Sequence, residues 1–284
     1  MILIADGGST KVDWVVLNDK GIEVFRTRTQ GLNPALLSIE ALKERVLADG
    51  QLTQIKAQVD TLYFYGAGCG TKEAVLKLEK VFASIFVKAE LGVYEDMLAA
   101  VYASSGGEES IVCILGTGSN SCYFDGEIAF SNVVSLGYLI MDEASGNYFG
   151  KQLVRDYYYN RMPEEIALNF EKKYDLAPTT IKQKLYREES PNAYLGDFAS
   201  FMFDYTDHEY MHNLLKKGFS EFIEYRILAY EKHQNVPIYF IGSIAYFFEK
   251  ILRETAYEYH ISIAGIIRRP IDNLIIYHKK KILG

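Results

Sequence analysis

Short apolar runs recur in the same order in the two halves of the chain. Residues 2–4 and 111–115 are each followed by a Gly-rich turn, a second apolar run and a further turn. A third short run comes next, at residues 22–25 and 128–130. Runs of this length joined by Gly-containing turns are typical of β-hairpins. Each half is therefore predicted to begin with three strands.

The rest of each half alternates between predicted strands and helices. The further strands share an apolar composition and cover residues 62–65, 88–93, 238–241 and 260–265. The helix after the first of them has apolar side chains at helical spacing, at Val75, Leu78, Phe82 and Ile85. Closing helices are predicted at residues 96–104 and 270–281, with Pro270 at a first helical position. The repeated succession indicates two related α/β halves.

Length and composition support two domains. The chain has 284 residues, of which 49% are hydrophobic, so it can bury two sizeable cores. We expect domains at residues 1–105 and 106–284. The second half has an additional, mainly helical segment at about residues 131–235, and the helix at residues 270–284 is expected to pack back on the first domain.

Charge and cysteine content exclude some classes of partner. The net charge of −7 disfavours nucleic acid and anionic membranes as partners. No apolar segment approaches the about 18 residues of a membrane-spanning helix, and we expect a cytoplasmic protein. Cys69, Cys113 and Cys122 lack the spacing of a metal site and are predicted to be buried, reduced thiols.

The two Gly-rich turns are the strongest candidates for binding chemistry. They consist of Asp6, Gly7, Gly8, Ser9, Thr10 and Lys11, and of Gly116, Thr117, Gly118, Ser119 and Asn120. Glycine lets backbone N–H groups approach an anion, and Ser and Thr hydroxyls add donors. Two such turns could hold a polyphosphate, whereas either turn alone could simply be a tight hairpin.

Four motifs in this order resemble those of a known family. Besides the two turns, they are the Asp-Glu-Ala-Ser-Gly stretch at residues 142–146 and Ile-Gly-Ser at residues 241–243. Together they resemble the N-acetylglucosamine kinases of the BadF/BadG/BcrA/BcrD ATPase group, in the actin, Hsp70 and sugar-kinase superfamily. The resemblance implies a duplicated ribonuclease H-like, actin-like ATPase fold of class α/β. Each of its two lobes would have a mixed five-stranded sheet, with a helical insertion in the second.

The resemblance also implies ligands and residue roles. ATP, Mg²⁺ and an amino sugar would bind, and a homodimer is compatible with the family. The turns would bind the phosphates, and Asp6 would face Mg²⁺ through water. Gly242 and Ser243 would lie near the adenine, with Gly218 on the opposite wall, although Gly242 also suits simple strand-to-helix packing.

Asp96 is the candidate general base. In the similar kinases an Asp opens the helix after the last strand of the first lobe and accepts the proton of the sugar hydroxyl. Asp96 occupies that setting, and Glu95 is the second candidate. The alternative is a plain helix N-cap, a position that Asp favours.

Sugar contacts are expected from Asn33, Asn120 and Asp142, in addition to Asp96. Asn33 could instead cap a helix with Pro34 at its first position, and Asp142 could belong to a solvated acidic pair with Glu143. Residues 133–138 depart from the family, which has a Gly-rich run ending in Trp-Gly-His there; only Gly137 remains. N-acetylglucosamine is therefore a first hypothesis, and another hexose or amino sugar stays open.

Two other functions are compatible with parts of the sequence. The BadF/BcrA group includes ATPases that activate other enzymes through a cysteine-bound iron–sulfur cluster, and a nucleotide-binding regulator would also use this fold. His208, Glu209 and His212 form the His-Glu-x-x-His pattern of zinc metalloproteases. No convincing third ligand accompanies them, because Glu221, Glu224 and Glu231 lie on what is predicted to be one continuous helix.

Overall fold

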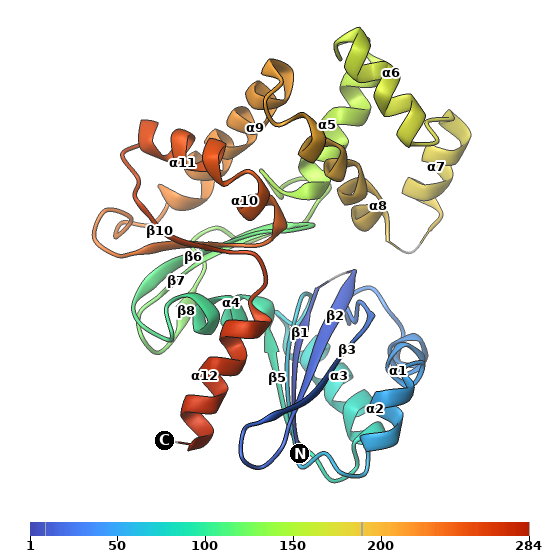
Figure 1. Ribbon diagram of the computed structural model, residues 1–284, viewed down its shortest axis with the longest axis vertical. Coiled ribbons are helices and arrows are strands. Elements are labelled where there is room, and N and C mark those ends of the chain that lie inside the picture. The colour runs from blue at the N-terminus through green and yellow to red at the C-terminus, as the bar shows by residue number, and fades with distance from the viewer. Residues whose placement is uncertain (9, 189, 284) are drawn as a thin grey trace. The chain divides into compact units, whose positions relative to one another are not determined.

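The computed structural model describes residues 1–8, 10–188 and 190–283, and the chain divides into two compact units. The first unit combines Met1–Gly106 with Pro270–Gly284, and the second is Gly107–Arg269 (Figure 1). The last helix of the chain therefore belongs to the first unit. Ser9, one of the predicted phosphate-binding residues, lies outside the described residues.

The first unit is built on a mixed five-stranded sheet of order β3-β2-β1-β4-β5. Its strands are β1 (Ile2–Gly7), β2 (Lys11–Leu17), β3 (Glu23–Gln30), β4 (Thr61–Gly66) and β5 (Glu90–Glu95). The first three are antiparallel neighbours, whereas β4 and β5 run parallel to β1. Its helices are α1 (Ile39–Leu47), α2 (Gly50–Ile55), α3 (Lys72–Ile85), α4 (Asp96–Ser104) and α12 (Ile271–Leu283).

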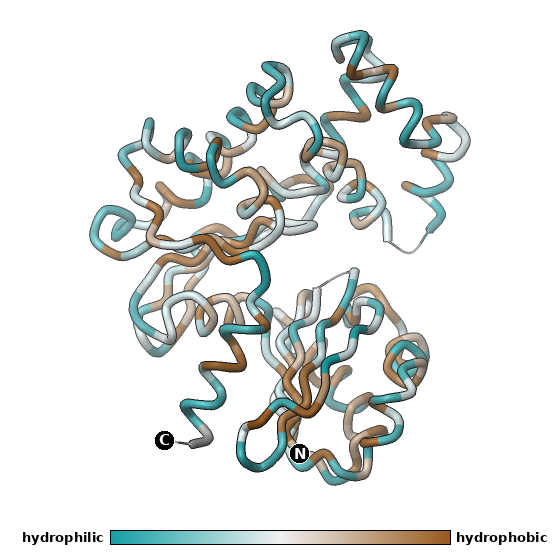
Figure 2. The backbone as a smooth tube through the Cα atoms, viewed as in Figure 1, coloured by the Kyte–Doolittle hydropathy of each residue, from teal (hydrophilic) through white to brown (hydrophobic). Residues whose placement is uncertain are grey.

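Both faces of this sheet are covered, because alternate residues of a strand point to opposite faces. Leu3 of β1 joins one buried cluster that includes Leu42 of α1 and Phe82 of α3. The neighbouring Ile4 joins another cluster, which includes Ala99 of α4 and Leu274 of α12. The strands of both units are correspondingly rich in apolar residues (Figure 2).

The second unit repeats the same topology. Its sheet order is β10-β9-β6-β7-β8, formed by β6 (Ser110–Leu115), β7 (Ser119–Phe124), β8 (Ala129–Phe130), β9 (Ile238–Ile241) and β10 (Ile263–Ile267). Strand by strand, this order and the strand directions match those of the first unit. The prediction of a duplicated fold with two mixed five-stranded sheets is confirmed.

A helical segment interrupts the second unit between β8 and β9. It contains α5 (Gly146–Tyr158), α6 (Glu164–Lys173), α7 (Pro178–Tyr186), α8 (Pro191–Phe198), the 3₁₀-helix η1 (Ala199–Tyr205), α9 (Glu209–Phe222) and the π-helix η2 (Ile223–Ile227). After β9 come α10 (Ser243–Phe247) and α11 (Glu249–Glu258). None of the helices in the described ranges is both long and apolar enough to cross a membrane.

Several predicted boundaries differ from the structure. The helix after the Asn33 loop begins at Ile39, and not at Pro34 as in the alternative for Asn33, because Ser38 is its N-cap and accepts a hydrogen bond from the N–H of Ala41 at 3.2 Å. Pro270 precedes rather than opens the assigned helix α12, although its carbonyl accepts the N–H of Leu274. The three cysteines are free and buried, as predicted.

Candidate active site

In the first unit, the parallel strands β1, β4 and β5 end at the same edge of the sheet. Asp6 is level with Tyr65, which is level with Tyr94 on the next strand. Asp96 follows two residues after Tyr94, as the first residue of α4. The fold thus brings Asp6 and Asp96 to one edge, at the carboxyl ends of the strands, where open α/β sheets bind their ligands.

Asp6 is a buried carboxylate among other negative charges. Burial and the negative charges of Asp13 and Asp96 together raise the pKa of Asp6 to about 7, and Lys11 opposes them. Asp13 is paired with Arg28, whose Nε lies 2.6 Å from Oδ1. Carboxylates are the protein ligands that suit Mg²⁺, and the magnesium role of Asp6 stays a prediction.

Asp96 has the properties of a proton acceptor. Burial and, to a smaller extent, the charge of Glu95 raise its pKa to about 7, against hydrogen bonds from the N–H groups of Met97 and of Asp96 itself that lower it. Burial also raises the pKa of Glu95. The N-cap position belongs to Glu95, which makes no side-chain capping hydrogen bond; Asp96 is the first residue of α4, where its carboxylate accepts N–H groups of the first turn. A carboxylate with a pKa near neutral pH is suited to general-base catalysis.

The first Gly-rich turn is tightly closed. The N–H of Gly8 donates to the carbonyl of Lys11 at 2.8 Å, and the carbonyl of Thr10 accepts from Gly31 at 3.0 Å. A Cβ added to Gly7 would lie 2.6 Å from the Phe64 ring, so packing as well as ligand approach requires glycine there. The side chains of Thr10 and Lys11 are exposed beside this turn.

Asn33 lies against the loop that follows β4, at residues 68–70, which the sequence did not indicate. Its Oδ1 accepts the N–H of Ala35 at 3.0 Å, so it closes a turn instead of capping the predicted helix. A Cβ added to Gly68, whose φ is +83°, would lie 2.1 Å from this oxygen. A Cβ added to Gly70 would lie 3.1 Å from a carboxylate oxygen of Glu95. Residues 68–70 therefore lie against both Asn33 and Glu95, and the Gly-x-Gly spacing was the available signal.

In the second unit, three segments meet at the corresponding turn. The carbonyl of Gly116 accepts the N–H of Gly146 at 2.8 Å, and the carbonyl of Thr117 accepts that of Asn147 at 2.9 Å, so the turn is joined to the start of α5. Gly242 has φ +118°, and a Cβ there would lie 2.3 Å from the carbonyl oxygen of Leu115. Ser243 begins α10 directly afterwards.

Asp142 is a buried member of this assembly. Its Oδ2 accepts Asn147 Nδ2 at 2.8 Å and lies where a Cβ of Gly118 would come within 2.8 Å. Burial raises the pKa of Asp142, whereas hydrogen bonds from Asn147 and the N–H of Ser119 lower it. The solvated-pair alternative is wrong, because Asp142 is only 7% exposed.

Asn147 is a candidate that the sequence did not indicate. Its Oδ1 and the Ser119 hydroxyl are buried and have no hydrogen-bond partner within the described parts of the chain. Buried polar groups without partners are costly, and they are common where a ligand completes the hydrogen bonding. Asn120 lies beside them at the start of β7, with its Oδ1 bonded to the N–H of Ser121 at 2.9 Å.

The structure does not form the predicted contact of Gly218 or the zinc site of His208 and His212. Gly218 faces the rings of Phe149 and Tyr148, which explains its small size by core packing. His208 is the N-cap of α9, and its Nε2 lies 3.0 Å from Glu165. His212 approaches a different carboxylate, Glu254, at 3.5 Å. No group of three or more metal-ligating side chains gathers among residues 1–8, 10–188 and 190–283, so the zinc-site geometry does not form.

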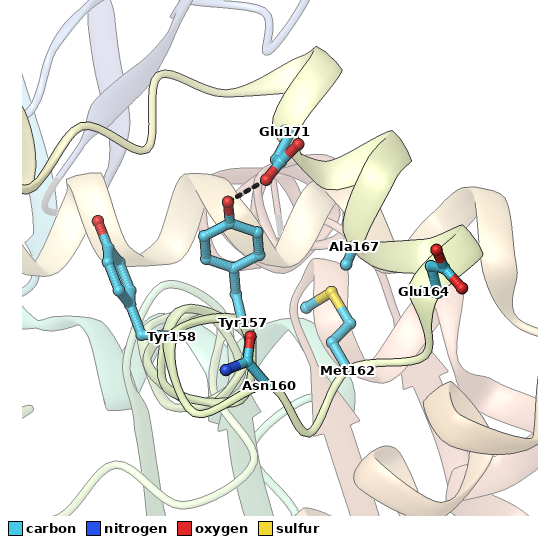
Figure 3. A pocket seen from close by; sticks show the side chains of 7 residues that line it. All are labelled: Tyr157, Tyr158, Asn160, Met162, Glu164, Ala167 and Glu171. Carbon is cyan, nitrogen blue, oxygen red and sulfur yellow. Dashed lines mark hydrogen bonds between the residues drawn. The ribbon is translucent and has the colours of Figure 1, made fainter.

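A pocket of about 480 Å³ lies in the helical segment; Tyr157 of α5 donates to Glu171 of α6 there, and Tyr158 stands beside them (Figure 3). Met162 and Glu164 complete one side of it. Its lining contains none of the predicted site residues, so it provides no support for the ligands proposed above.

Two sheets of identical strand order, each with a Gly-rich turn between its first two strands, define the actin-like ATPase and sugar-kinase fold. A proposed N-acetylglucosamine kinase from Porphyromonas gingivalis has a TM-score of 0.91, with 32% sequence identity over 99% of both chains. The chain belongs to the N-acetylglucosamine kinase-like family of this superfamily.

More distant structures agree in fold alone. A proposed N-acetylglucosamine kinase from Chromobacterium violaceum has a TM-score of 0.72 at 14% identity, over 97% of this chain and 98% of that one. A ROK family glucokinase from Streptomyces griseus, in complex with glucose and AMPPNP, has a TM-score of 0.61 at 11% identity, over 98% of both chains. Comparison with family models gives no match, and comparison with curated proteins gives none.

Proposed function

We propose that the protein is an ATP-dependent kinase that phosphorylates a hydroxyl of an amino sugar, with N-acetylglucosamine as the first substrate to test. The observation that carries this proposal is Asp96, a partly buried carboxylate with a pKa of about 7 at the edge where Asp6 also lies. The family relationship to a proposed N-acetylglucosamine kinase supports the substrate class.

In the proposed reaction, Asp96 accepts the proton of the attacking sugar hydroxyl. The sugar oxygen forms a bond to the γ-phosphorus of ATP, the bond from that phosphorus to the bridging oxygen breaks, and ADP leaves. Such transfers depend mainly on positioning and on neutralising charge. Bound Mg²⁺ would neutralise charge on the phosphate oxygens, with Asp6 as its proposed holder through water.

The remaining predicted residues would orient the two substrates. Backbone N–H groups of the Gly7–Lys11 and Gly116–Ser119 turns would donate to phosphates. Asn33, Asn120 and Asp142 would bind sugar hydroxyls, because amides and carboxylates offer paired donors and acceptors. Gly242 and Ser243 would lie beside the adenine.

The test is a coupled assay of ADP release with Mg·ATP and a panel of sugars: N-acetylglucosamine, N-acetylmannosamine, N-acetylmuramic acid, glucosamine and glucose. We expect release that depends on one amino sugar, and loss of that release in Asp96→Asn with nucleotide affinity retained in calorimetry. ADP release that no sugar stimulates would contradict the kinase proposal and favour an ATPase.

An ATPase activator or nucleotide-binding regulator is the second candidate function. The activators of this group hold an iron–sulfur cluster on cysteines, but Cys69, Cys113 and Cys122 are all buried. Burial raises the pKa of Cys69 to about 12, which makes it a poor thiolate ligand. Nucleotide binding without any ADP release would favour the regulator. The homodimer is a separate proposal, to be tested by light scattering.

A further inference from the structure

The segment that precedes Asp142 exposes an unusual amount of apolar side chain. Val134 and Ile140 are each 71% exposed, Leu139 is 78% exposed and Leu136 is 59% exposed. A dense apolar surface of this kind commonly marks a binding site. The segment has no strand or helix of its own between β8 and α5, so something else has to hold it in place.

A buried arginine holds both ends of this segment. Arg226 is 1% exposed, and its NH1 donates to the carbonyl of Val133 at 2.9 Å. NH2 lies 3.6 Å from the sulfur of Met141, and Nε lies 3.9 Å from a carboxylate oxygen of Glu143. One guanidinium thus reaches Val133 at the start of the segment, Met141 just before Asp142 and Glu143 just after it. Lysine has no comparable fork of donors.

The π-helix η2 explains how this arginine is turned inward. A π-turn inserts an extra residue into a helical face, and such turns are frequent at functional sites. Here Ile223, Arg226 and Ile227 are all buried on η2. Burying the charged side chain of Arg226 costs free energy of folding unless its N–H groups are hydrogen-bonded. The segment supplies such a bond through the carbonyl of Val133.

We propose that Arg226 is a positioning residue that fixes residues 133–143, and through them Asp142, for binding of the sugar substrate. This inference rests on the proposed function and refines it. Asp142 has a left-handed backbone, with φ +70°, so its placement depends on restraints from its neighbours.

Charge is a second link between Arg226 and Asp142. The groups that act on Asp142 are Asn147, the N–H of Ser119, Arg226 and Lys151, and all four lower its pKa against the effect of burial. Lys151 also donates to the carbonyl of Tyr138 at 2.9 Å. Loss of the arginine should therefore move the acid limb of sugar binding to higher pH, since Asp142 would protonate more readily.

The structural test is hydrogen exchange of the backbone amides in the full chain. In Arg226→Met, amides of residues 133–142 should exchange about tenfold faster, while those of β6 stay unchanged. Arg226→Lys keeps the charge but loses the fork, and it should show a smaller change in the same segment. Arg253→Met is the control, because Arg253 also pairs with a glutamate, Glu249, and donates to a carbonyl, but far along the chain on α11.

The functional test separates sugar binding from turnover. Arg226→Met should raise the KM for the sugar by about tenfold or more, with the KM for ATP within twofold of wild type. Glu143→Gln should show a weaker form of both effects, and the double variant should be no worse than Arg226→Met, because the two side chains act as one unit.

Unchanged exchange of residues 133–142 in both Arg226 variants would overturn the proposal. So would faster exchange combined with a wild-type sugar KM and an unshifted pH profile, since Arg226 would then serve the fold alone. A wild-type protein that releases no ADP with any sugar would overturn the proposed function. In that case, binding of N-acetylglucosamine and glucosamine measured by calorimetry replaces KM and still decides the role of Arg226.

Discussion

Replacing Asp96 with Asn is expected to remove catalysis and, at the same time, to stabilise the fold. Both effects have one cause: the fold buries the carboxylate of Asp96, and burial disfavours its charged form. The raised pKa of Asp96 means that the folded protein binds the proton more tightly than the unfolded chain does. The Asn variant has no charge to desolvate.

The magnitude and its pH dependence follow from the pKa. A shift from 3.8 to about 7 corresponds to roughly 4 kcal/mol if the whole effect reached stability. Asp96 is only partly buried, and solvent screens part of it, so we expect about 1–2 kcal/mol. The folded-state pKa is the higher one. The cost of the charge is therefore absent below about pH 4, grows as the pH rises to about 7 and stays constant above that.

Urea unfolding at pH 8 and at pH 4 measures the effect. Asp96→Asn should exceed wild type in free energy of unfolding at pH 8 and match it at pH 4, while turnover falls by about 10²- to 10⁴-fold. Glu90→Gln is the control, an exposed carboxylate on the preceding strand, with an expected change within about 0.5 kcal/mol at both pH values. Equal or lower stability of the Asn variant at pH 8 would refute the electrostatic argument.

Three further predictions test the two units separately. Asp6→Asn should weaken binding of Mg·ATP by about tenfold in calorimetry and leave metal-free nucleotide affinity within twofold; equal losses would remove Asp6 from the metal role. In wild type, log(kcat/KM) should fall with unit slope or steeper below about pH 7, because Asp96 and Asp6 both have a pKa of about 7, and a flat profile down to pH 5 would contradict this. Gly242→Ala should cost about 2–4 kcal/mol, because a positive φ is combined with a Cβ 2.3 Å from the Leu115 oxygen. Gly126→Ala, with φ +104° in open space, should cost only about 1–2 kcal/mol, and equal losses would show that backbone strain alone matters at Gly242.

The strands were predictable because their signals are local. Each apolar run, together with the turn that follows it, identified a strand, and the repeat of the pattern indicated the duplication. The start of α1 stayed open in the sequence because Pro34 and Ser38 both precede it, and only packing decides between two such starts. Asp6 and Asp96 could be proposed because their motifs resemble those of the similar kinases, and the structure brings both to one edge through parallel strands.

Contacts that depend on irregular backbone could not be predicted in this way. Asn147 reaches Asp142 because Asp142 and Ala144 both adopt left-handed conformations, which no spacing rule reveals. In the sequence, Arg226 is a single charged residue among apolar ones, and nothing there indicates its contacts. The π-turn changes the phase of that face and buries the arginine with its neighbours, so its role emerges only from the three-dimensional structure.

The environments of the acidic residues distinguish the site from the surface. Burial raises the pKa of Asp6 at the end of β1, of Asp96 at the start of α4 and of Asp142 in the loop before α5. Backbone hydrogen bonds lower the pKa of Asp125 and Asp175, which close exposed turns. Stability alone would favour exposed, hydrogen-bonded carboxylates such as the latter two. Because carboxylates with a raised pKa concentrate at functional sites, Asp6, Asp96 and Asp142 are the acidic residues to replace first.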